Sequence, residues 1–182
     1  DPNRHMEHRM STLELKELSH PSGEVIKIAA GKTLDLKSQG SVTMPTGSVL
    51  QVVHGTTSTQ VDTTSSSYVD TGLTATITPS STSSKILAIY SPSIYQAVSG
   101  TALTIQLVRG STSIAVHGYA LFASGAVVIS QVAATHLDSP ATTSATTYKI
   151  QMKTESSKSI TANYDDGAGD THSTITLMEI QG

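Results

Sequence analysis

The stretch Leu73-Thr74-Ala75-Thr76-Ile77 alternates apolar and polar residues, and the turn-forming run from Pro79 to Ser84 follows it. Because successive side chains of a β-strand point to opposite faces, this alternation predicts a strand with one buried and one exposed face. The same pattern recurs in residues 103–107 and 175–178. These stretches predict a protein built from half-buried strands.

Similar short runs continue through most of the chain, separated by loop signals rich in Ser, Gly, Pro and Asp. About nine such strands without an intervening helical period favour an antiparallel β-sandwich. The predicted strands cover residues 48–54, 68–78, 85–91, 102–109, 113–117, 126–135, 146–154, 159–163 and 173–180.

The composition excludes several functional classes. The chain contains 27 Ser and 27 Thr among 182 residues, whereas charged residues make up 14% and aromatic residues 4%. Enzymatic α/β domains typically carry about 25% charged residues and long helices. Thr suits a pleated strand, and its hydroxyl keeps a sheet face soluble without charge. We therefore expect an all-β protein with a neutral, hydroxyl-rich surface.

The charge and the cysteine content exclude several kinds of partner and site. The formal net charge is −3, and only 11 Lys and Arg residues are spread along the chain, so the basic patch of a nucleic-acid binder is missing. The lack of cysteine excludes disulfides and thiolate metal sites. No apolar run approaches the roughly 18 residues of a membrane helix. We expect neither a nucleic-acid partner nor membrane insertion.

The N-terminal part has its own pattern. We expect residues 1–9 to be an expression scar and residues 10–25 to be an attachment leader, because both are polar and lack a secretory signal. From residue 26, apolar-polar-apolar triplets begin every eight residues, with Gly-containing turns between them. The triplets begin at Ile26, Leu34, Val42 and Leu50.

A repeat this short cannot close a core alone, so its apolar stripe needs a partner. Three interpretations remain open: a β shaft of three chains wound round one axis, hairpins packed on the main domain, or a disordered leader. A trimeric shaft over residues 26–47 would carry a head over residues 48–182, and the thin core expected of one chain also favours a homotrimer. The shaft would bury Ile26, Ile28, Leu34, Leu36, Val42 and Met44.

No catalytic motif is evident. Gly31-Lys32-Thr33 resembles the end of a phosphate-binding loop, but that motif requires Gly where this chain has Ile26. Neither a G-x-S-x-G elbow nor an H-E-x-x-H motif is present. We expect a protein that is not an enzyme and that uses no cofactor.

Asp165, Asp166 and Asp170 form the densest acidic segment. Their oxygens could surround a structural cation such as Ca²⁺, although a solvated hairpin loop explains the same residues. With Glu155 they could also supply the carboxylate pair of a glycosidase, but nothing in the sequence fixes the distance between them. The scattered histidines would hold a metal only on a threefold axis, and they are His54, His117, His136 and His172.

The tyrosines supply almost all of the aromatic area, since the chain has no Trp and a single Phe. Tyr90 and Tyr148 lie in apolar strand context and are predicted to be in the core. Tyr95, Tyr119 and Tyr164 lie beside predicted loops, where a phenol ring can stack on a sugar or contact a protein. These three are candidate receptor contacts, and the alternative is that each covers an edge of the sandwich.

Several phrases of the chain are distinctive when taken together, and they cover residues 10–13, 31–36, 45–53, 69–87 and 175–180. The most specific parts are an Ile-Thr-Pro-Ser-Ser segment followed by Lys-Ile-Leu, and a closing Met-Glu-Ile. On these residues the chain resembles small trimeric fibre or receptor-binding proteins of tailed bacteriophages, particularly marine ones.

This resemblance implies a homotrimer on the virion with a short β shaft and a C-terminal jelly-roll head similar to tumour-necrosis-factor and complement-type heads. The N-terminus would attach to other virion proteins, and the head would bind a host cell-surface glycan or protein. Two alternatives remain open: a decoration or adaptor protein of the virion that binds no receptor, and a polysaccharide depolymerase.

The shaft interpretation predicts the effect of one charge at its axis. Leu34→Asp would place three carboxylates in an apolar interior, so we expect loss of the trimer or a sharp fall in melting temperature. Size-exclusion chromatography with light scattering and a thermal melt would measure both. A variant that stayed trimeric at unchanged stability would show that assembly does not depend on the repeat.

Overall fold

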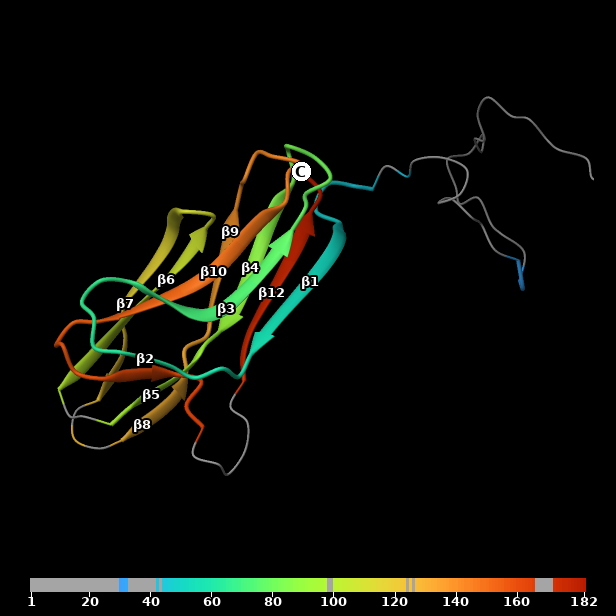
Figure 1. Cartoon of the computed structure of the whole chain (residues 1–182). Coiled ribbons are helices and arrows are strands. Elements are labelled where there is room, and N and C mark those ends of the chain that lie inside the picture. The colour runs from blue at the N-terminus through green and yellow to red at the C-terminus, as the bar shows by residue number, and fades with distance from the viewer. Residues whose placement is uncertain are drawn as a thin grey trace, which may run out of the picture. The chain divides into compact units, whose positions relative to one another are not determined.

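Figure 1 shows the computed structural model of the chain, which describes residues 30–32, 42, 44–97, 100–123, 125, 127–165 and 172–182, apart from the side chains of residues 119, 121 and 123. The chain divides into two units, residues 1–43 and Met44–Gly182. Of the six shaft candidates, Ile26, Ile28, Leu34 and Leu36 lie outside the described residues. Val42 and Met44 are 48% and 41% exposed. The shaft itself remains a prediction.

The described residues form twelve strands in three four-stranded antiparallel sheets. The first sheet has the order β1 (Val49–Thr57), β12 (Ser173–Ile180), β4 (Lys85–Ser91), β9 (Ala134–Asp138). The second sheet has the order β3 (Val69–Ile77), β10 (Thr146–Thr154), β6 (Thr101–Arg109), β7 (Thr112–Ala123). The third sheet has the order β2 (Val61–Thr63), β11 (Ile160–Ala162), β5 (Ser93–Gln96), β8 (Val128–Gln131).

The chain passes repeatedly between the first and second sheets. It runs from β1 to β3, back to β4, across to β6 and β7, back to β9, across to β10 and back to β12. Two interleaved four-stranded antiparallel sheets of this kind define a jelly-roll-like sandwich. The structure thus confirms the predicted all-β antiparallel class, and the described residues contain no helix.

The third sheet arises because two long stretches bend. Pro92, which lacks the N–H that a strand ladder needs, separates β4 from β5, and Val132 and Ala133 separate β8 from β9. The backbone N–H of Val132 donates to the Pro92 carbonyl at 3.0 Å, so the two bends lie together. The predicted single strand over residues 126–135 was therefore wrong, and the short strands β2 and β5 were missed. Figure 1 shows β2, β5 and β8 at one end of the sandwich.

The core lies between the first and second sheets and follows the predicted alternation. In β3 every second residue from Thr71 to Ile77 is buried, and in β12 every second residue from Ser173 to Glu179 is buried. Each fully buried aliphatic or aromatic side chain contributes about 1.5–3 kcal/mol. Tyr90 and Tyr148 are 1% and 0% exposed, which confirms them as core residues.

Hydrogen bonds join the two sheets through the phenol groups. Tyr148 Oη donates to Asp138 Oδ2 at 2.7 Å, and Arg109 Nη1 donates to the same carboxylate at 2.7 and 2.8 Å. Tyr90 Oη lies 2.6 Å from His117 Nε2. Burial raises the pKa of Tyr90 to about 12, and burial together with the hydrogen bond to Asp138 raises the pKa of Tyr148. Both phenols therefore stay protonated, and as neutral groups they link strands of the first sheet to strands of the second.

Glu179 fastens the loop that follows β3. Its buried carboxylate accepts hydrogen bonds from the Ser80 N–H at 2.7 Å, from the hydroxyls of Ser80 and Ser84 at 2.6 Å, and from Gln51 Nε2 at 2.6 Å. Burial alone would raise the pKa of Glu179, but these hydrogen bonds outweigh it and lower the pKa to about 2. The Pro-Ser-Ser loop and the Met-Glu-Ile strand, the two most specific phrases of the sequence, are thus physically joined.

Because folding lowers the pKa of Glu179 from 4.5 to about 2, its ionised form stabilises the fold above pH 4.5, and this stabilisation is lost as the pH falls toward 2. We expect Glu179→Gln to lower the melting temperature at pH 7 by at least about 4 °C. The difference from the wild-type chain should shrink between pH 4.5 and 2. Thermal melts across that range measure it, with Asp165→Asn at an exposed position as the control. A constant difference at every pH would contradict this role.

The buried side-chain amide of Gln96 destabilises the fold. Its side chain is 0% exposed, and neither Oε1 nor Nε2 has a hydrogen-bond partner among the described residues. An unpaired buried amide costs about 1–3 kcal/mol, so we expect Gln96→Met to raise the free energy of unfolding by about 1 kcal/mol or more. Gln106→Met is the control, because its amide is hydrogen-bonded to Gln151 and Ser113 and its loss should destabilise. Urea titration measures both, and a destabilised Gln96→Met would show that the amide is paired in solution.

Candidate functional site

The outer face of the third sheet presents one row of side chains across all four strands. Thr161 on β11 is paired with Asp62 on β2 and with Tyr95 on β5, and Tyr95 is paired with Ile129 on β8. Residues paired directly across strands lie on the same face of a sheet. The row therefore combines an exposed carboxylate, a buried hydroxyl, a partly exposed phenol and the 54% exposed side chain of Ile129.

Tyr164 adds a second aromatic ring to this row. The rings of Tyr95 and Tyr164 are stacked, with centroids 3.9 Å apart and an interplanar angle of 10°. Neither residue is fully buried. The structure therefore brings two of the three candidate receptor contacts together, although they are 69 positions apart in the sequence (164 minus 95). We call Tyr95, Tyr164, Asp62, Thr161 and Ile129 the tyrosine site.

Asn163 fixes the position of Tyr164. Its φ of 56° is left-handed, a conformation that Asn tolerates better than most residues, and it turns the chain as β11 ends. The buried Asn163 side chain donates to the Thr59 carbonyl at 2.8 Å and accepts from the Ser173 hydroxyl. Its backbone N–H donates to the Ser93 carbonyl at 2.9 Å. The ring of Tyr164 thus follows a residue tied to three other segments.

Asp62 supplies the charge of the tyrosine site. Its carboxylate accepts a hydrogen bond from the Thr161 hydroxyl at 2.5 Å and another from Gln60 Nε2 at 2.9 Å. The hydrogen bond from Thr161 and then that from Gln60 lower the pKa of Asp62. The carboxylate is therefore ionised at neutral pH. Aromatic surface beside a fixed carboxylate is chemistry suited to a sugar, whose C–H face packs on a ring and whose hydroxyls donate to the carboxylate.

The other candidate residues lie elsewhere or outside the described residues. Tyr119 belongs to β7, which continues to Ala123, so the expectation that it lies beside a loop was wrong. Its side chain is not described. Asp165 is exposed, whereas Asp166 and Asp170 lie outside the described residues. Within the described part of the chain, no three His, Asp or Glu residues are grouped to hold a metal ion. The cation site and the carboxylate pair remain untested predictions.

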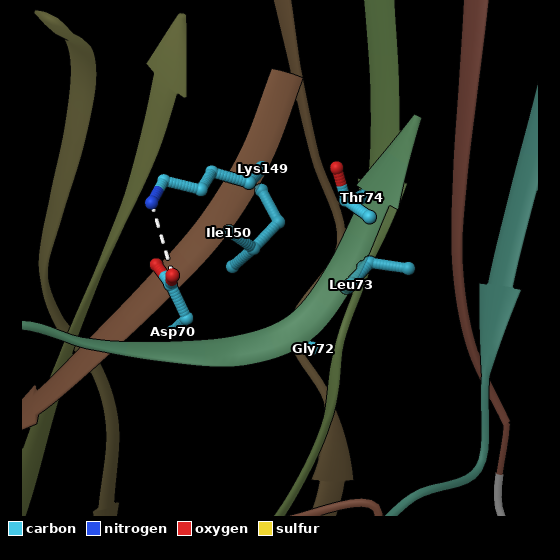
Figure 2. Close-up of a pocket in the computed structure, with 6 residues that line it drawn as sticks. All are labelled: Asp70, Gly72, Leu73, Thr74, Lys149 and Ile150. Atoms are coloured by element: carbon cyan, nitrogen blue, oxygen red, sulfur yellow. Dashed lines mark hydrogen bonds and ion pairs between the residues drawn. The ribbon is translucent and has the colours of Figure 1, made fainter. Parts of the chain in front are cut away.

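A second feature lies where β3 bends. Between Asp70 and Thr74, β3 has two residues more than the facing segment of β10, and Gly72 has a φ of 82° at this bulge. An open hollow of about 240 Å³ lies there, lined by Asp70, Gly72, Leu73, Thr74, Lys149 and Ile150. Figure 2 shows the ion pair between Lys149 Nζ and Asp70 Oδ2, 2.9 Å long, at its side.

The hollow ends a line of side-chain hydrogen bonds over the outer face of the second sheet. Ser113 Oγ donates to Gln106 Oε1 at 2.8 Å, and Gln106 Nε2 donates to Gln151 Oε1 at 2.6 Å. Gln151 Nε2 then donates to Asp70 Oδ1 at 2.6 Å. Burial would raise the pKa of Asp70, but the bonds from Lys149 and Gln151 outweigh it and lower the pKa. These four polar side chains are thus hydrogen-bonded in one continuous line.

Comparisons with known proteins give only distant likenesses. No protein-family model and no curated protein matches the chain. Among solved structures, it is similar to the VP2 subviral particle of infectious bursal disease virus, with 15% identity, a TM-score of 0.41 and 83% of this chain covered. It is also similar to the structure of the Gx strain of that virus, with 18% identity, a TM-score of 0.39 and 90% of this chain covered.

The chain spans about two fifths of the length of these virus proteins, 37% of the first and 41% of the second. At such TM-scores the likeness assigns no function to this chain. The function of the chain must therefore be inferred from its own residues.

The described residues contain no helix long and apolar enough to cross a membrane.

Proposed function

We propose that the chain is a virion attachment protein, a non-enzymatic homotrimeric fibre whose head binds a host cell-surface glycan through the tyrosine site. The stacked pair of Tyr95 and Tyr164 is the observation that carries the proposal. The resemblance of the sequence to phage fibre proteins supports the virion location, and the jelly-roll-like head agrees with it. The N-terminal residues would attach the fibre to other virion proteins.

The geometry of the tyrosine site favours a sugar ring over a charged partner. A ring stacked on its neighbour is held flat, so little conformational entropy is lost when a ligand packs against the pair. Asp62 offers the carboxylate oxygens that sugar hydroxyls use, and its hydrogen bond from Thr161 keeps it oriented. The exposed side chain of Ile129 extends the apolar surface beyond Tyr95. A neutral saccharide fits this combination without the burial of an unpaired charge.

Attachment through such a site depends on multiplicity. A single shallow aromatic site binds a glycan weakly, but three sites on one head and several heads on one particle raise the effective affinity strongly. The neutral Ser- and Thr-rich surface supports this role, because it neither attracts nor repels charged envelopes. A homotrimer is therefore part of the proposal.

The test is binding of the labelled full chain to an array of bacterial surface oligosaccharides and to host cells. We expect Tyr95→Ala and Tyr164→Ala each to weaken glycan binding at least about tenfold, because a central aromatic contact is typically worth more than 1.4 kcal/mol. Tyr164→Phe keeps the ring and should bind within about twofold of the wild-type chain.

Tyr68→Ala is the matched control, because Tyr68 is a partly exposed tyrosine that lies against Lys153, 5.4 Å from the ring centroid to Nζ, and not in the tyrosine site. It should leave binding unchanged. Thermal melts show that each variant is folded. If the wild-type chain bound neither glycans nor cells, the adaptor alternative would replace this function. Binding that survived both alanine variants would move the site elsewhere on the head.

A further inference from the structure

The outer face of the first sheet carries an apolar row that the core does not use. In β12 the residues that alternate with the buried ones point away from the core, and Met178 is one of them. Met178 is paired with Val52 on β1 and with Leu87 on β4, and Leu87 is paired with Leu137 on β9. Four apolar side chains therefore lie side by side across all four strands.

These side chains are partly or largely exposed. Val52 and Leu137, at the two edges of the sheet, are 56% and 53% exposed, and Met178 and Leu87 between them are partly exposed. Ile89, on the same face of β4, adds a further 40% exposed side chain. Single exposed apolar residues are normal on a protein surface, but a contiguous row indicates a contact surface. We call Val52, Met178, Leu87, Leu137 and Ile89 the apolar face.

Among its described residues, the second sheet has no such apolar row across its four strands. Its outer face holds the hydrogen-bonded line from Ser113 to Asp70, and its exposed large apolar residues, Val116 and Phe122, lie on the edge strand β7. Both sheets contribute alternate residues to the same core. The difference between their outer faces therefore has no cause inside the sandwich, and it indicates that the first sheet has a partner outside it.

The lack of charge on this face suits another copy of this chain as its partner. Lys85 and His54 are the titratable residues among the outward-facing side chains of the described strands of this sheet, and the other outward positions are apolar, Thr or Ser. A face with so little charge offers no complementary charges to a charged partner. Three copies of it converge around a threefold axis without like-charge repulsion across the row, and each covers part of the apolar surface of the next.

The apolar surface also continues toward the end of the sheet where the unit begins. Gly47 and Gln181 are joined by a backbone hydrogen bond of 2.8 Å, and so are Ser48 and Gln181. Val49, 50% exposed, is paired with Ile180 next to this point, and Met44, 41% exposed, lies three residues before Gly47. Exposed apolar residues thus recur at Met44, Val49 and Val52 along the first residues of this unit.

We infer that copies of this chain assemble through the apolar face of the β1-β12-β4-β9 sheet, and this inference rests on the proposed homotrimer for its stoichiometry. The contact buries Val52, Met178, Leu87, Leu137 and Ile89 between heads. The polar second sheet and the third sheet with its tyrosine site then face outward. The assembly and the glycan site occupy different sheets.

The first experiment measures the mass of the full chain by size-exclusion chromatography with light scattering. We expect a mass three times the 19.0 kDa of one chain. We expect Leu137→Glu and Val52→Glu each to give the mass of a single chain, or to raise the dissociation constant of the trimer at least tenfold. Val116→Glu is the matched control, because Val116 is 57% exposed on the other sheet and its replacement should leave the mass unchanged.

The second experiment uses the natural lack of cysteine in the chain. Met178→Cys lies in the middle of the apolar face, so mild oxidation should link two copies in high yield, whereas Val116→Cys should stay unlinked. Thermal melts confirm that the variants fold. A monomeric wild-type chain, or equal linking of both cysteine variants, would overturn the assignment. Glycan binding by a monomeric Leu137→Glu chain would show that the tyrosine site works even where assembly fails.

Discussion

The alternation of side chains along each strand is the constraint on which this structure depends. Two four-stranded sheets must bury one face each against the other, and the chain has no helix in its described residues to cover either face. Every second residue of β3, β10 and β12 is therefore committed to the core. Register follows from the same constraint, since a slip of one residue would turn each apolar set outward.

Buried polar side chains hold the loops and strand ends of this sandwich in place more than its central strands. Glu179 ties the loop after β3 to the last strand, Asp138 joins Arg109 and Tyr148, and Asn163 joins the start of β12 to the segments of Thr59 and Ser93. Each group has several partners, so its burial costs little. Gln96 is the exception, and its unpaired amide lies in β5, one of the two strands that the sequence did not predict.

The three sheets divide the surface into parts with different chemistry. The first presents an apolar face without much charge, the second a line of hydrogen bonds satisfied among its own side chains, and the third a stacked pair of tyrosines beside a carboxylate. Assembly through the first sheet would leave the third accessible. This arrangement suits a protein that must form a stable multimer and still display several copies of a weak site.

The sequence by itself determined the strand class, most strand positions and the core tyrosines, because period-two alternation and Ser, Gly and Pro turns act locally. It singled out Tyr95 and Tyr164 but not their stacking, since 69 positions separate them and their segments meet through the tertiary pairing of β11 with β5. Gly55 shows the same limit: a Cβ there would lie 2.2 Å from the Thr74 carbonyl oxygen, a close approach that no local pattern reveals. Tertiary structure alone decided which outward residues form a row, because the register of four strands places Val52, Met178, Leu87 and Leu137 side by side.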